Sequence, residues 1–125
     1  MRLDYTVNVE LKNLPVIHKI NGRFFEQDSE GNRIKIVVVN DGVPAELEGA
    51  VIASIIRADG ETITAYGALE GCAAHVDLPS TAYAVTGRLQ VFVKLKKDED
   101  VVTLAAVEGK VYPSVTSEVI TNGNV

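Results

Sequence analysis

The stretch NDGVPAELEGAVIASIIRADGETI, residues 40–63, decides the fold class. A short apolar run, AVIASII, lies between two turns that each end in glycine. Asn-Asp-Gly and Ala-Asp-Gly supply residues that tolerate the positive φ angles of tight β-turns. The valine and isoleucines of the run are β-branched, which favours strand over helix. The stretch therefore predicts turn, strand, turn and strand.

The same pattern extends in both directions along the chain. YTVNVEL (5–11) alternates apolar and polar residues with period two, and RIKIVVVN (33–40) leads into the first turn. GRLQVFVKLKK (87–97) has one charged face interrupted only by Phe92. With about eight or nine such strands, the chain is predicted to be an all-β, antiparallel, immunoglobulin-like β-sandwich. At most one short helix is expected, around Ser80 to Ala84.

Length and composition indicate one soluble domain. The chain has 125 residues, of which 46% are hydrophobic and 23% charged, as in ordinary globular domains. We assign residues 1–112 to the sandwich. Residues 113–125 are rich in Ser, Thr, Asn and Gly, so they are predicted to be a linker or arm that leads to a further C-terminal region.

Charge and cysteine use exclude several classes of partner. The net charge of −5 disfavours nucleic acid, and the basic cluster of Lys94, Lys96 and Lys97 is followed directly by three acidic residues at a predicted hairpin tip. No apolar run approaches the length of about eighteen residues that a membrane span needs. The single cysteine, Cys72, cannot form an internal disulfide and is expected to be a small buried hydrophobe.

The sequence predicts no cofactor, no metal ligand and no catalytic residue. The two histidines, His18 and His75, are far apart and lack zinc-ligand spacing, and the glycines form no phosphate-binding loop. Two acidic groups leave a weak surface cation site as an alternative, but such groups are better explained as the solvated turns of a β domain. These groups are Glu26, Asp28 and Glu30, and Asp98, Glu99 and Asp100.

Three segments that cover nearly the whole chain resemble the N-terminal domain of phage baseplate upper proteins. They are YTVNVELKN, RIKIVVVNDGVPAELEGAVIASIIRADGETI and VDLPSTAYAVTGRLQVFVKL. The family pattern has an Asp-Asn-Gly turn followed by Pro and Leu-x-Gly, a strand that ends in Pro-Asp-Gly, and a later Leu and Gly before a long strand. The matching residues are Asn40, Asp41, Gly42, Pro44, Leu47, Gly49, Ala58, Asp59, Gly60, Leu78 and Gly87. Two positions differ: the Asn-Asp order is reversed, and Glu46 replaces Asp.

This resemblance implies a non-enzymatic virion domain that anchors a receptor-binding or fibre apparatus to the tail baseplate. The implied partners are other virion proteins and the chain itself, as a homotrimer of the full-length protein. It would be assembled in the host cytoplasm and located in the phage tail. The alternatives are a phage head-fibre or capsid decoration domain, a bacterial adhesion or carbohydrate-binding module, and a small hydrolase. The absence of tryptophan disfavours sugar binding, and the separated histidines disfavour hydrolysis.

The N-terminal segment is the candidate docking strand, because it alternates cleanly and precedes a break at KNLP. Its apolar residues are Leu3, Tyr5, Val7, Val9 and Leu11. Two interpretations remain open. The segment either leaves its own sandwich to join another sheet, or it forms the first strand of its own domain.

Overall fold

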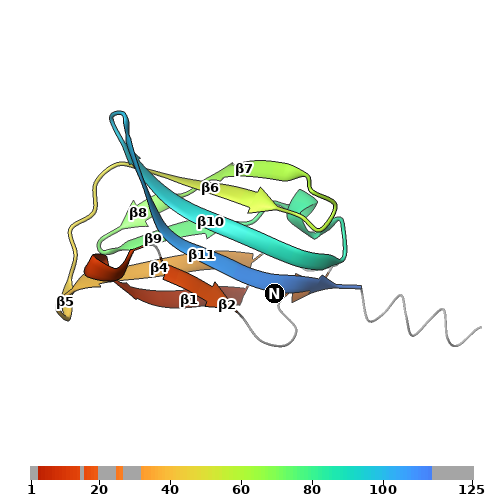
Figure 1. The fold of residues 1–125 in the computed structure, drawn as a ribbon, viewed down its shortest axis with the longest axis horizontal. Helices are drawn as coiled ribbons and strands as arrows, with labels where there is room; N and C mark the ends of the chain where they lie inside the picture. The colour runs from red at the N-terminus through yellow and green to blue at the C-terminus, as the bar shows by residue number, and fades with distance from the viewer. Residues whose placement is uncertain (1–2, 15, 20–24, 27–31, 114–125) are drawn as a thin grey trace, which may run out of the picture.

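The computed structural model describes residues 3–14, 16–19, 25–26 and 32–113, and they form two facing β-sheets (Figure 1). The prediction of an all-β sandwich with little helix is confirmed. The predicted linker or arm, 113–125, lies outside the described residues except for Pro113. Within the described residues no helix has the length and apolar character needed to cross a membrane.

Each sheet is named here by its strands in spatial order. The first sheet contains β1 (Leu3–Glu10), β4 (Asn32–Asn40), β9 (Ala73–Asp77) and β8 (Ala68–Glu70), with β5 (Val43–Pro44) also paired to β4. The second sheet contains β2 (Val16–Lys19), β11 (Asp100–Tyr112), β10 (Gly87–Lys97), β6 (Ala50–Ile56) and β7 (Thr62–Tyr66), with β3 (Phe25–Glu26) also paired to β11. From β4 onward this order is that of an immunoglobulin-like sandwich: β4-β9-β8 face β11-β10-β6-β7.

The sheets are mixed, which corrects the expectation of purely antiparallel pairing. From β4 onward all pairs are antiparallel, but β1 pairs in parallel with β4, and both β2 and β3 pair in parallel with β11. Parallel strands cannot be joined by a tight hairpin and need a crossover. Here the crossover from β1 to β4 includes the short 3₁₀ helix η1 (Leu11–Asn13), β2 and β3 of the other sheet.

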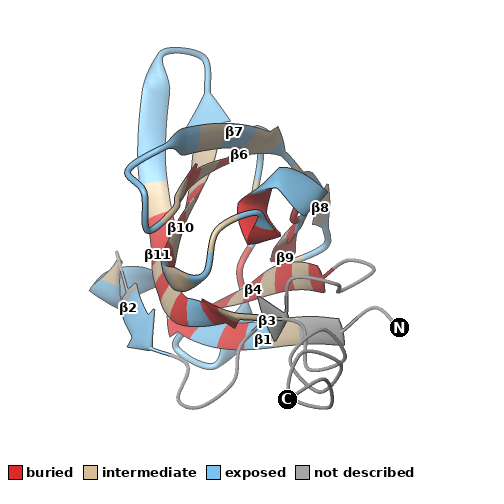
Figure 2. Ribbon diagram, turned by 90° about the vertical axis from the view of Figure 1, so that its right-hand side faces the viewer, coloured by how far each residue is buried: buried red, intermediate tan, exposed pale blue. Residues whose placement is uncertain are grey.

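The core lies between the two sheets, where alternate residues of each strand meet (Figure 2). Ile34, Ile36 and Val38 of β4 are fully buried, as are Val91 and Val93 of β10. This alternation is the period-two pattern that the sequence shows.

The candidate docking strand contributes to the same core. Val7 and Val9 are only 4% and 2% exposed, and β1 is paired with β4 along its whole length. Tyr5 packs against the core, whereas Leu11 lies in η1 and is 40% exposed. Leu3 begins the strand, and its side chain lies outside the described ones. The structure therefore places the segment as the first strand of its own domain.

The predicted short helix is the 3₁₀ helix η2 (Ser80–Tyr83), which connects β9 to β10. Tyr83 is buried, and its hydroxyl oxygen accepts a hydrogen bond of 3.0 Å from the side-chain amide nitrogen (Nδ2) of Asn32, the first residue of β4. Burial raises the pKa of Tyr83, so this hydroxyl stays neutral. This hydrogen bond links η2 to β4 of the first sheet.

Replacing Tyr83 with Phe should lower the free energy of unfolding by about 1–2 kcal/mol, because it leaves a buried amide donor of Asn32 without this acceptor. Urea unfolding followed by circular dichroism measures the change. The matched control is Tyr66→Phe, since Tyr66 is 77% exposed. An equal effect of the two substitutions would show that the hydrogen bond of Tyr83 contributes nothing.

The chain passes from the second sheet to the first at Gly67, between β7 and β8. The Gly67 amide donates a hydrogen bond of 2.9 Å to the carbonyl of Val51 in β6. A Cβ atom at Gly67 would lie 2.0 Å from the carbonyl oxygen of His75 in β9. Only glycine allows this close approach of three backbone segments.

Candidate functional site

The first turn of the family-like motif is the β4–β5 hairpin. Asn40 pairs with Val43, and Asp41 and Gly42 between them have φ angles of 52° and 81°. Two successive positive φ angles are the mark of a type I′ turn, which confirms the positive-φ turn predicted at this position. Lys12 donates to a carboxylate oxygen of Asp41 at 2.6 Å, and the Asp41 amide donates to Glu10 at 2.8 Å. The turn is thereby attached to the end of β1 and to η1.

The next part of the motif, residues 45–49, carries the chain from the first sheet to the second. The Ala45 amide donates to the carbonyl of Val38 at 3.0 Å, and Leu47 packs against the core. Gly49 has a φ angle of 120°, and a Cβ atom there would lie 2.4 Å from the backbone oxygen of Lys96. Glycine is therefore required at position 49 by both its φ angle and its contact.

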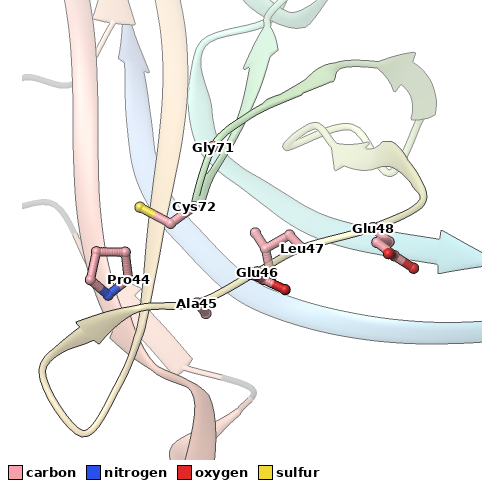
Figure 3. Close-up of a pocket in the computed structure, with 7 residues that line it drawn as sticks. All are labelled: Pro44, Ala45, Glu46, Leu47, Glu48, Gly71 and Cys72. Atoms are coloured by element: carbon pink, nitrogen blue, oxygen red, sulfur yellow. The ribbon is translucent and has the colours of Figure 1, made fainter.

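A surface hollow of about 530 Å³ lies along this segment (Figure 3). Its lining residues are Pro44, Ala45, Glu46, Leu47, Glu48, Gly71 and Cys72. Figure 3 shows the Cys72 thiol on the Pro44 side of the hollow. At the other side, the ammonium of Lys97 binds the Glu48 carboxylate and lowers its pKa. We call this region, with the β4–β5 turn, the hollow end of the sandwich.

The geometry brings no nucleophile and base together in the part of the chain that is described. Cys72 lines the hollow and is only partly buried, which corrects the prediction of a small buried hydrophobe. His75 lies on the outer face of the first sheet, between the buried Ala74 and Val76. The Nε2 atom of His75 lies 3.8 Å from a carboxylate oxygen of Glu70. His18 lies on β2 in the other sheet.

No group of three or more His, Cys, Asp or Glu residues in the described ranges is arranged to hold a metal ion. Asp98 and Glu99 form the turn between β10 and β11, and Asp100 is the first residue of β11. Of the other acidic group, Asp28 and Glu30 lie outside the described residues, and Glu26 is described only as part of β3. The predicted absence of a cofactor stays a prediction.

The remaining motif residues lie together at the opposite end of the sandwich, beside η2. Asp59 and Gly60 form the β6–β7 turn, where Gly60 has a φ angle of 87°. Gly87 has a φ angle of 116°, and its Cβ position lies 2.9 Å from the Cβ atom of Ala58. Arg57 donates to Asp59 at 3.0 Å and to the backbone oxygen of Thr81 in η2 at 3.2 Å. The motif is thus divided between two ends.

Hydrogen bonding by Arg57 lowers the pKa of Asp59. A carboxyl group whose pKa is lowered by folding stabilises the native state above its unfolded pKa, and this contribution is lost as the pH falls through the folded pKa. We therefore expect Asp59→Asn to destabilise the domain at about pH 7 but to have little effect at about pH 2. Urea unfolding at both pH values measures the difference. A loss of stability that is equal at both pH values would contradict the ion pair's role.

The sequence interpretation missed the outward face of the second sheet. Alternation places Phe92 of β10 beside Ala106 of β11 and Ser54 of β6 on this face, and Ala106 is paired in turn with Ile17. Ile17 and Tyr66 are 74% and 77% exposed. We call this set the apolar outer face. Its members are Ile17, Ile52, Ile56, Tyr66, Phe92 and Ala106. The interruption at Phe92 was the one signal of it in the sequence.

No family model matches the chain, and no curated protein is significantly similar to it in sequence. The function of the chain is therefore inferred from its residues and from their arrangement in the fold.

Proposed function

We propose that the chain is a non-enzymatic assembly domain of a phage virion that anchors a receptor-binding or fibre apparatus to the tail baseplate. The observation that carries this proposal is the placement of the baseplate-like motif. Five of its residues have positive φ angles and form the connections at the two ends of the sandwich: Asp41, Gly42, Gly49, Gly60 and Gly87. Motif residues that determine loop shape at both ends suit a domain that presents those ends to neighbours.

The surface of the domain also suits contact better than chemistry. The hollow end combines a surface depression with exposed apolar residues, namely Leu11 at 40% and Val43 at 63%. Exposed apolar patches with polar rims mark interaction sites in soluble proteins. The described residues supply no paired nucleophile and base, so binding is the function that these surfaces support best.

The fold changes the way in which β1 would dock. Because β1 is bonded to β4 and buries Val7 and Val9, it does not need to leave the sandwich to reach a partner. A partner strand would instead be added beside β1, which ends the first sheet in the described part of the chain. We propose other virion proteins as the partners that dock beside β1. We also propose that the chain binds further copies of itself, with a trimer of the full-length protein as the assembled form.

A genetic test follows from the anchoring role. Phage particles that carry a deletion of residues 32–112 from this protein should assemble tails that lack the fibre apparatus and adsorb poorly to host cells. Protein composition of purified particles and adsorption assays measure both effects, and supply of the intact protein from a plasmid is the control. Deleted particles with complete fibres and normal adsorption would contradict the anchoring role. Loss from heads with intact tails would instead favour the head-fibre alternative.

A further inference from the structure

The apolar outer face is unexpected in a two-layer sandwich, because the outward face of each sheet is normally polar. The pairings run across five of the six strands of the second sheet. Ile17, Ala106 and Phe92 lie in one row, which continues through Ser54 and Thr64, and the adjacent row joins Lys94, Ile52 and Tyr66. Exposed large apolar residues on an outward sheet face, here Ile17 and Tyr66 at its two edges, indicate a surface that another molecule covers.

The charges around this face are mainly basic. Five basic residues and one acidic residue lie on the same face, so its net charge is 5 − 1 = +4 on a chain whose net charge is −5. The residues are Lys19, Arg88, Lys94, Lys96, Lys110 and Glu108. Glu108 accepts a hydrogen bond of 2.6 Å from Arg88, which leaves the excess of basic residues toward solvent. A partner for this face therefore needs an apolar surface with acidic residues.

The hollow end of the same protein has that chemistry. It carries five carboxylates, and Lys12 and Lys97 each pair with one of them, so its net charge is 2 − 5 = −3. The carboxylates are those of Glu10, Asp41, Glu46, Glu48 and Glu70. The exposed Val43 precedes the lining residue Pro44, and the exposed Leu11 lies in η1, whose Lys12 binds Asp41 of the turn. The region is therefore acidic and combines a hollow with apolar residues beside it.

We infer that the hollow end of one copy binds the apolar outer face of another copy, in a head-to-tail contact. Opposite charge and exposed apolar residues on both surfaces favour this pairing. A two-fold contact of the outer face with itself would instead bring two surfaces of charge +4 together, which is unfavourable. Because the two surfaces differ, the contact is heterologous and propagates into a ring or a filament. The inference rests on the assembly role proposed above and deepens it by naming a partner.

The test uses sedimentation velocity of the 125-residue chain over a range of concentrations, at low and high salt. The wild-type chain should show a mass above 13.4 kDa that rises with concentration and falls with added salt. A face variant carries Ile17→Ser and Tyr66→Ser, and an end variant carries Val43→Ser and Glu46→Lys. All four substituted residues are exposed, so both variants should fold.

Each variant alone should be monomeric, because it lacks one half of the contact. A mixture of the two should form a dimer of twice the 13.4 kDa mass, since the intact end of one variant still fits the intact face of the other. Glu61→Lys, at the opposite end of the sandwich, is the control for a charge change and should associate like the wild type.

A wild-type chain that stays monomeric at every concentration would overturn the inference, and so would a mixture that remains monomeric while the wild type associates. A face variant that still self-associates would also overturn it. None of these results would affect the anchoring role, which the composition of phage particles tests separately.

Discussion

Gly67→Ala should reduce the free energy of unfolding by about 3 kcal/mol or more, at the upper end of the cost of overpacking a core. The added Cβ atom would lie 2.0 Å from the carbonyl oxygen of His75 and 2.8 Å from a methyl carbon of Val76. The first of these atoms belongs to the backbone of β9, so relief requires the two sheets to move apart at the β7–β8 crossing. Urea unfolding followed by circular dichroism measures the loss.

Gly60→Ala is the matched control for this substitution. Gly60 has a positive φ angle of 87°, but a Cβ atom there meets nothing within 4 Å. We expect it to cost about 1–2 kcal/mol from backbone conformation alone. If Gly67→Ala costs no more than Gly60→Ala, the close approach of the chain at the crossing between the sheets does not exist.

Deletion of residues 1–12 should abolish cooperative unfolding of the domain. The deletion removes all eight pairings between β1 and β4 and the buried side chains of Val7 and Val9. Burial of each valine contributes about 1.5–3 kcal/mol, which for two residues is a large part of the stability of a small domain. The exposed edge of β4 would also invite aggregation.

Thermal unfolding followed by circular dichroism measures this effect. The control is Asn8→Ser, because Asn8 lies on β1 but is exposed, and it should change the stability by less than about 0.5 kcal/mol. A truncated chain that unfolds as cooperatively as the full chain would show that β1 is a separable docking arm, which was the other interpretation of its sequence.

The strands and turns of this fold could be predicted from the sequence because their signals are local. The type I′ turn at Asp41 and Gly42 follows from residues that accept positive φ angles, and the burial of Ile34, Ile36 and Val38 follows from alternation. The position of η2 was predicted from Ser80 or Thr81 at a helix start, and the helix does begin at Ser80, although its N-cap is Pro79 and no side chain caps it.

The parallel pairing of β1 and the crossing at Gly67 could not be predicted, because both depend on residues distant in the chain. Gly67 lies in a segment that reads as one continuous strand with β7, and only the approach of His75 shows why it is glycine. Similarly, the motif at residues 40–49 gives no sign that Asp59 and Gly87 lie at the opposite end of the sandwich.

The apolar outer face shows the same limit. Alternation within β6 or β10 defines two faces of a strand but does not say which residues of neighbouring strands share a face. Phe92 could be recognised as an exception among charged residues, whereas its connection with Ile17 through Ala106 required the pairings of β10, β11 and β2.

Mass spectrometry of purified phage tails and heads, from lysates of cells that produce this chain, tests the assembly role most directly. The account predicts that peptides of the chain are found in the tail fraction at a constant ratio to baseplate proteins, and that they are depleted from heads. Peptides confined to heads, or to the cell surface in the absence of particles, would contradict it.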